Sequence, residues 1–201
     1  MSVNDKMTAI ANAIRSKTGD TAALTLDGMA TAISGISGGG GASYDISADC
    51  LEGTTVNPVL DPSATSIRAY MFYEYTNLAL TSLPSGLTSI GSNAFFQCYN
   101  LAITSLPSGL TSIGSDAFYE CHNLALTAIP SKVTSIGIDA FHECVSIESI
   151  TFEGKPDSIA TSAFTKCTNL LIINVPWAEG AVANAPWGAT NATINYDYTG
   201  A

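Results

Sequence analysis

The chain has 201 residues, of which 46% are hydrophobic and only 12% are charged, and its formal net charge at pH 7 is -10. Globular chains carry about 25% charged residues, so serine, threonine, asparagine, glycine and tyrosine must form most of this surface. Nucleic acids and anionic membranes are bound by clustered lysine and arginine, whereas the 7 cationic residues here are scattered. We therefore expect neither a nucleic acid nor a membrane as a partner.

Residues 1–36 are expected to form a small helical module. Two runs of apolar residues recur at helical spacing there, and Gly19 is a plausible helix stop between them. Helices this short are not stable alone in water, so these apolar positions form a predicted assembly interface. They are Val3, Met7, Ile10, Ile14, Leu26, Met29, Ile33 and Ile36. No basic region followed by a continuous apolar run begins the chain, so we expect no signal peptide.

Other segments flank a regular central part. Residues 37–43, SGGGGAS, have the composition of a flexible linker. Residues 44–64 are expected to cap the N-terminal end of the central part, and residues 178–201 to cap its C-terminal end. Within the latter, TINYDYT (193–199) alternates as a β-strand does.

Residues 65–177 consist of five copies of a 23-residue unit without insertions. One column of the alignment is phenylalanine in every copy: Phe72, Phe95, Phe118, Phe141 and Phe164. A unit this short cannot bury its own apolar side, and stacking of successive units completes a shared core. The sequence therefore predicts a solenoid of about five coils.

Each coil is predicted to combine a short helix with extended pieces, which makes the fold an α/β repeat. Ala94, Phe95 and Cys98 share one face of a helix over SNAFFQCYN. The pieces LTSIG and TSLP are read as strands that end at turns. Threonine in early copies, as at Thr127, stands where later copies have Ile150 and Ile173, which indicates a shifted strand or a bulge in the early coils.

Few residues suggest chemistry. Four cysteines recur every 23 residues (Cys98, Cys121, Cys144 and Cys167). A disulfide ladder or a metal site is conceivable, but packing is favoured because buried cysteine behaves as a small hydrophobic residue. The two histidines, His122 and His142, lack a recognisable ligand spacing. With no catalytic constellation in view, we expect no enzyme activity, no cofactor and no metal.

A row of rings is the sharpest candidate for a binding surface. The position after the repeated phenylalanine is aromatic or imidazole in four copies, and on a helix it points away from the core. Exposed aromatic stripes are typical of contact surfaces, although packing between coils or a subunit contact remains an alternative. The row is Tyr73, Phe96, Tyr119 and His142, flanked by Tyr99 and His122.

The repeated pattern I-G-x-x-A-F-x-x-C-x-x-L, followed by L-P-x-x-L/V-T-S-I-G, resembles the leucine-rich repeats of the bacterial surface antigen type, called BspA-like. The resemblance covers about residues 65–177 and implies a leucine-rich-repeat solenoid. The first copy departs from it with Arg68, Met71 and Tyr75, and the fifth copy with Ala160.

The end segments carry a second resemblance. KMTAIANAIRSKTGDTAALTLDGMATAISGI (6–36) is similar to an N-terminal segment of tail-associated proteins of phages that infect Gram-positive bacteria, and APWGATNATINYDY (185–198) resembles the C-terminal end of repeat proteins from that setting. These resemblances imply a virion or tail-like-particle protein that contacts other tail or baseplate proteins and a host cell-surface glycan or protein. By analogy with tail fibres it would be a homo-oligomer, such as a trimer. An exported surface adhesin and a purely structural virion decoration protein are the alternatives.

Overall fold

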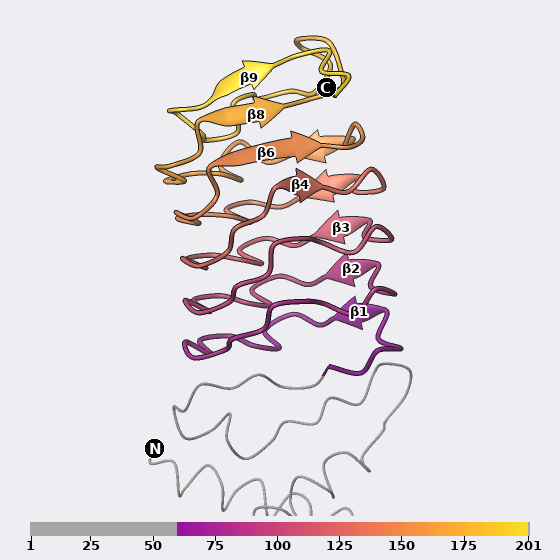
Figure 1. The fold of residues 1–201 in the computed structure, drawn as a ribbon, viewed down its shortest axis with the longest axis vertical. Coiled ribbons are helices and arrows are strands. Elements are labelled where there is room, and N and C mark those ends of the chain that lie inside the picture. The colour runs from indigo at the N-terminus through magenta and orange to yellow at the C-terminus, as the bar shows by residue number, and fades with distance from the viewer. Residues whose placement is uncertain (1–59, 201) are drawn as a thin grey trace, which may run out of the picture.

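A computed structural model describes residues 60–200 of the chain, and Figure 1 shows them as a stack of similar coils that rises from β1 to β9. The expected helices and linker of residues 1–43, and residues 44–59 of the expected cap, lie outside the described residues. The eight assembly-interface candidates, from Val3 to Ile36, lie there too.

One parallel sheet runs along the whole stack. Its strands come from the repeated Ser-Ile pair, with the serine half-buried or exposed and the isoleucine buried in the core. Each strand pairs with its equivalent 23 residues later, as Ser66 does with Ser89. The strands, in order across the sheet, are β1 (Ser66–Ile67), β2 (Ser89–Ile90), β3 (Ser112–Ile113), β5 (Ser135–Ile136) and β7 (Ser158–Ile159).

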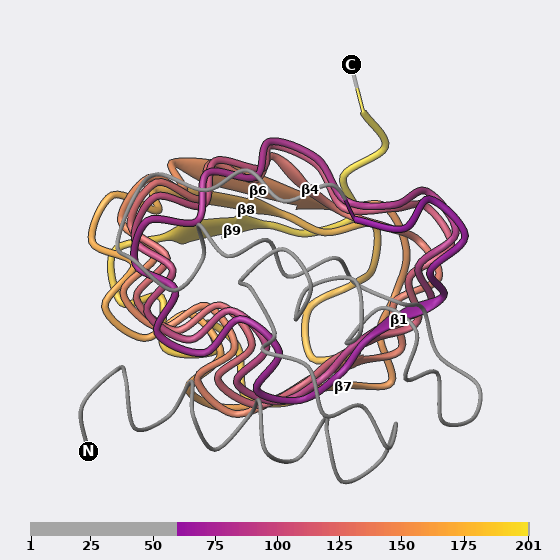
Figure 2. The same ribbon diagram turned by 90° about the horizontal axis from the view of Figure 1, so that it is seen from below.

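A second parallel sheet lies on another side of the coils, and in the view along the stack successive coils nearly superimpose (Figure 2). It begins only in the third aligned coil. Its strands, in order, are β4 (Ala128–Ile129), β6 (Ser149–Phe152), β8 (Ile172–Asn174) and β9 (Thr193–Asn195). The strand expected in TINYDYT is thus present as β9, and it pairs with β8. The described residues form a parallel β-solenoid of about six coils.

The start of this second sheet coincides with a shift in the buried positions. In the third aligned coil the buried side chains are spaced by two and then three residues, and in the fourth by three and then two. They are Leu124, Leu126 and Ile129, followed by Ile147, Ile150 and Phe152. Thr127 is exposed, whereas Ile150 is buried. The shifted strand expected from the threonine column is confirmed.

The expected helix in each coil is wrong: residues 93–98 form consecutive turns, and the part of the chain described here contains no helix, hence none that could cross a membrane. Asn93 and Gln97 both have a φ of 56°, in the left-handed region that ends a right-handed helix. The amides of Asn93, Phe95 and Gln97 donate to carbonyls of the next coil at 2.8–2.9 Å. Ala94 and Cys98 donate to carbonyls three residues back. Hydrogen bonds between coils therefore replace the helical ones, and the repeat is a β-and-turn unit rather than an α/β unit.

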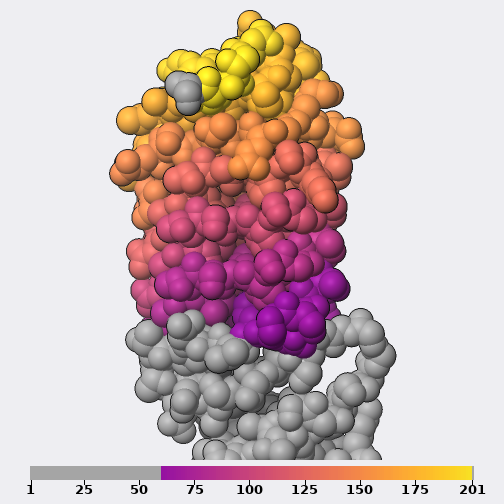
Figure 3. All heavy atoms as spheres, turned by 45° about the vertical axis from the view of Figure 1, so that its right-hand side comes forward, coloured from indigo at the N-terminus to yellow at the C-terminus, as the bar shows by residue number. Residues whose placement is uncertain are grey.

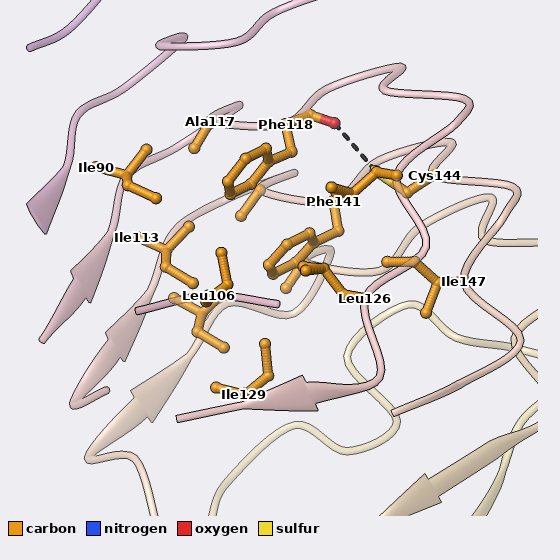
Figure 4. Close-up of a cluster of buried hydrophobic side chains, with 14 of the residues drawn as sticks. Ile90, Leu106, Ile113, Ala117, Phe118, Leu126, Ile129, Phe141, Cys144 and Ile147 are labelled. Carbon is orange, nitrogen blue, oxygen red and sulfur yellow. Dashed lines mark hydrogen bonds between the residues drawn. The ribbon is translucent and has the colours of Figure 1, made fainter. Parts of the chain in front are cut away.

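The core is a column of stacked rings. The phenylalanines of successive coils lie 5.1–5.4 Å apart between ring centroids, with planes within 9° of parallel. Figure 4 shows Phe118 and Phe141 in this arrangement, with the branched side chains of Ile113 and Leu126 beside them. Because each ring covers the next, all but the end faces of this column are removed from water, which is the main stabilising contribution of such a core.

The last described coil closes this core. Trp187 is fully buried and its indole nitrogen donates to the carbonyl of Ala183 at 2.8 Å. Its ring packs 5.9 Å from Phe152 and 6.5 Å from Trp177. In the space-filling view this yellow and light-orange end lies over the orange coils below it (Figure 3). The two tryptophans thus replace the phenylalanine column at the C-terminal end.

A column of glycines lets the coils approach each other. A Cβ atom on Gly114 would lie 2.5 Å from the backbone nitrogen of Ser92 in the preceding coil, and one on Gly137 would lie 2.4 Å from that of Ser115. Both distances are shorter than real Cβ contacts allow. These glycines are therefore required for the close approach of two backbones.

Replacing Gly114 by alanine is expected to destabilise the protein by about 2 kcal/mol or more, since backbone rather than a flexible side chain must move. Gly86→Ala is the matched control, because its added Cβ would meet only the Ala64 carbonyl oxygen at 3.5 Å. Urea unfolding followed by far-UV circular dichroism measures both variants. Equal midpoints for the two would contradict the close-approach role.

Candidate binding surface

The four rings that follow the core phenylalanines form a second stack, outside the core. Centroid distances are 4.8 Å from Tyr73 to Phe96, 4.7 Å from Phe96 to Tyr119 and 4.4 Å from Tyr119 to His142, with planes about 11° apart. Tyr73 is 36% exposed and the other three are half-buried. We call Tyr73, Phe96, Tyr119 and His142 the outer ring stack. The sequence placed these rings outside the core by a helical argument, and the turns place them there instead.

A shorter stack runs beside it. The rings of Tyr99 and His122 lie 4.9 Å apart and 16° from parallel. The Tyr99 hydroxyl donates to Glu120 at 3.5 Å, and Glu120 also accepts a 2.9 Å hydrogen bond from the Gln97 amide. Since Glu120 follows Tyr119 in the chain, these side chains join the two stacks. The structure thus brings all six ring candidates to one side of the turn segments.

Ring faces in the outer ring stack are mostly occupied. Each ring presents its faces to the rings of the coils before and after it, because identical positions repeat at the spacing of neighbouring strands, about 4.8 Å. Outward from the stack, the surface consists of ring edges and tyrosine hydroxyls. Such a surface provides an apolar wall with a few polar tips, which suits a contact with another molecule.

Carboxylates line both sides of the rings, and the sequence analysis did not single them out. They occupy the two left-handed positions of each turn segment, three residues before the ring and one residue after it. The five are Glu74, Asp116, Glu120, Asp139 and Glu143, each with a φ between 50° and 60°. The recurrence of D/N-A-F-x-E/Q-C in the alignment was the signal for them.

These carboxylates act on the tyrosines electrostatically. Burial raises the pKa of the Tyr119 hydroxyl, and the negative charges of Glu120, Glu143 and Asp139 raise it further, against a smaller opposing effect of Lys166. The pKa of the Tyr99 hydroxyl is raised by burial and by Glu120 in the same way. Both hydroxyls therefore remain protonated donors on this surface at neutral pH.

His142 ends the outer ring stack among acids. Its Nδ1 lies 3.5 Å from Asp139 and its Nε2 lies 3.8 Å from Glu143, distances at which a protonated ring would pair with either carboxylate. Neither nitrogen makes a hydrogen bond within the structure. Within residues 60–200, no group of three or more histidine, cysteine, aspartate or glutamate side chains is arranged to hold a metal ion.

The cysteine column is part of the core, as expected from its spacing. The thiols from Cys98 to Cys167 are free and buried, and each donates to the carbonyl of the phenylalanine 26 residues earlier. Figure 4 shows one such bond, from Cys144 to Phe118, at 3.0 Å. Burial raises the pKa of Cys98 and of Cys167 to about 12, and raises those of Cys121 and Cys144 well above 9. These thiols are packing residues.

A hollow of about 540 Å³ opens at the C-terminal coils, away from the rings. Phe152, Pro176 and Tyr198 are among its lining residues. We expected a surface without a preformed pocket, and this open hollow departs from that expectation. It is lined mainly by backbone and apolar atoms.

Residues 45–176 match the family described as the BspA type leucine rich repeat region, with six copies, and the chain belongs to this family. The match includes residues 45–64, which we had assigned to a cap rather than to a repeat. The family is a repeat scaffold, a class whose members typically bind partners through an extended surface. No curated protein matches the chain.

Two solved structures share the fold. A leucine-rich repeat protein from Bacteroides ovatus ATCC 8483 is 32% identical over 57% of this chain, with a TM-score of 0.50, and the match covers 30% of that protein. A leucine-rich repeat protein from T. pallidum is 24% identical, with a TM-score of 0.50, over 62% of this chain and 73% of that one. The chain thus spans under a third of the length of the Bacteroides protein, and the second likeness concerns the fold alone.

The buried thiols should make the protein less stable in alkali. A folded-state pKa above the ordinary value means that the native state keeps a proton that the unfolded state releases. The contribution is therefore complete below about pH 9 and is lost as the pH rises toward 12, by up to about 1.4 kcal/mol per pH unit for each thiol. Urea unfolding at pH 8, 9 and 10 measures this loss. In a Cys121→Ala, Cys144→Ala variant the slope should be smaller, and an unchanged slope would assign the effect to tyrosines.

Proposed function

We propose that this chain is a non-enzymatic adhesion protein that binds a host cell-surface glycan or protein through the outer ring stack. The observation that supports the proposal is the continuity of the stack over four coils, from Tyr73 to His142, on the outside of a rigid core. A row of aromatic edges with hydroxyl tips is unusual on a surface that otherwise consists of serine and threonine, and aromatic residues are enriched where proteins meet partners.

The family supports the same role in a coarser form. Leucine-rich repeats of this type form extended scaffolds, and each coil adds the same kind of contact at a fixed spacing. Partners that repeat along their own length gain affinity from several weak contacts made together. The solenoid therefore suits a surface polymer or an extended protein better than a small molecule.

Binding of fluorescently labelled full-length protein to a panel of Gram-positive cells tests this role. Wild type should bind some strains, and a Tyr73→Ala, Phe96→Ala, Tyr119→Ala, His142→Ala variant should lose at least about tenfold of that binding, as expected when several contact residues are truncated. A second variant, Phe96→Leu with Tyr119→Leu, keeps apolar packing while removing the rings, in case the first fails to fold.

The matched control replaces outward threonines of the same coils on another side: Thr81→Ala, Thr104→Ala and Thr127→Ala. It should bind as wild type does. Equal binding by wild type and both ring variants would place recognition on a different face. Absence of binding to every strain would leave a structural decoration role as the better account.

For the setting, we propose a phage tail or a phage-tail-like particle, in which residues 1–36 dock to tail or baseplate proteins and assemble copies of the chain, as in a trimer. The similarity of residues 6–36 and 185–198 to tail-associated proteins supports this proposal. An exported surface adhesin is the competing setting, and the BspA type of the repeats favours it.

Deleting residues 1–43 separates these settings. In the tail setting, the truncated chain should lose incorporation into purified particles, measured by immunoblot, and should sediment as a smaller species in analytical ultracentrifugation. Labelled-cell binding should persist, with an avidity lowered to that of a single copy. Unchanged incorporation and mass would contradict the docking and assembly roles of Val3 to Ile36.

A further inference from the structure

The outer ring stack is bordered by acids that the chain itself leaves almost uncompensated. Residues 70–75, 93–98, 116–121 and 139–144 contain no lysine or arginine. The one ammonium paired with these acids is that of Lys166 in the next coil, which is 3.3 Å from Glu143 and itself 61% exposed. Exposed pairs of this kind contribute little.

The repeat places these acids directly over one another. Asp139 is the equivalent of Asp116 one coil later, and Glu143 is the equivalent of Glu120. Burial raises the pKa of the Asp116 carboxyl, and the negative charge of Asp139 raises it further. Like charges stacked at the spacing of coils repel each other, and a cation bound from outside would relieve that repulsion.

We propose that the outer ring stack binds a polypeptide segment rich in lysine or arginine, with the carboxylates pairing with its charges. This rests on the proposed function of the same surface and specifies the class of its partner. The long methylene stems of lysine and arginine would lie along the ring edges, as such stems do on apolar surfaces. Their charged ends would reach the carboxylates on both sides, from Asp116 and Asp139 to Glu120.

The same geometry disfavours other occupants. A neutral sugar would need open ring faces, whereas the faces from Phe96 to Tyr119 are covered by neighbours 4.4–4.8 Å away. An anionic polymer would meet the carboxylates. A second copy of this chain would bring the same acids and an overall charge of -10, so like charges would face each other.

The first experiment uses the full-length protein and a fluorescein-labelled octapeptide of alternating lysine and glycine, followed by fluorescence anisotropy. Its controls are the same peptide with every lysine acetylated, and one with glutamate in place of lysine. The lysine peptide should bind at least about tenfold more tightly than the acetylated one, and its binding should weaken at 0.5 M salt because partly exposed charges are screened. Equal affinity for the lysine and acetylated peptides would overturn the proposal.

A charge variant locates the binding. Asp116→Asn with Glu120→Gln gives the third coil the residues that the second coil already has at these positions, Asn93 and Gln97, so the fold is expected to tolerate it. This variant should lose most of the lysine-peptide affinity. Glu153→Gln with Glu179→Gln is the matched control, since both acids are exposed outside the turn segments. If both variants bind the peptide as wild type does, the proposed surface is wrong.

The cell assay distinguishes the two proposals. Ring-dependent cell binding that the charge variant retains, and that a neutral chito-oligosaccharide rather than the lysine peptide competes away, would overturn the basic partner while the adhesion role stands. Acid-dependent binding of the lysine peptide without binding to any cell would support the basic partner and overturn adhesion. Cell binding that the charge variant loses and the lysine peptide competes away would support both.

Discussion

Hydrogen bonding between coils determines the rest of this structure. Every coil must offer backbone donors and acceptors to the coil before and after it, because a buried amide without a partner is costly. In the two sheets this is ordinary parallel pairing, with Ser89 opposite Ser112 and Ile150 opposite Ile173. In the turn segments it requires left-handed residues such as Asn93 and Gln97, which turn alternate amides toward the next coil.

Strict pairing also stacks equal side chains, with unequal consequences. For phenylalanine and cysteine, stacking excludes water and is favourable, as in the column from Phe95 to Phe141. Threonine hydroxyls bond to the equivalent carbonyl of the coil before, as Thr111 does to Thr88 at 2.8 Å. For aspartate and glutamate the same geometry brings like charges together. The surface that carries the rings is therefore also where the fold accumulates electrostatic repulsion.

The 23-residue period carried most of the fold, and local spacing carried less. The alignment placed each core phenylalanine, each cysteine and the outer rings correctly, because position in the repeat alone determines their surroundings. It failed on the helix over residues 93–98. Ala94, Phe95 and Cys98 point inward at a spacing that suits a helix and also suits consecutive turns, and propensity does not report which carbonyl an amide will choose. The tertiary requirement for pairing with the next coil overrode the local pattern.

Ring candidates were found in the sequence because aromatic residues stand out among serine and threonine. The neighbouring acids were missed, since they alternate with Asn93 and Gln97 and so do not form an invariant column. Only the structure places Glu120 against both Gln97 and Tyr99, and only there do the acids border the same surface as the rings.

The constant offset of 23 residues makes the molecule extensible. Residues 88–110 and 111–133 are nearly identical in sequence and present matching edges to their neighbours. Loss of one copy joins Leu110 to Thr134, which reproduces the existing junction of Leu110 with Thr111. Unequal recombination between the two copies therefore lengthens or shortens the solenoid by whole coils, and the reach of its surface can evolve separately from the chemistry of each coil.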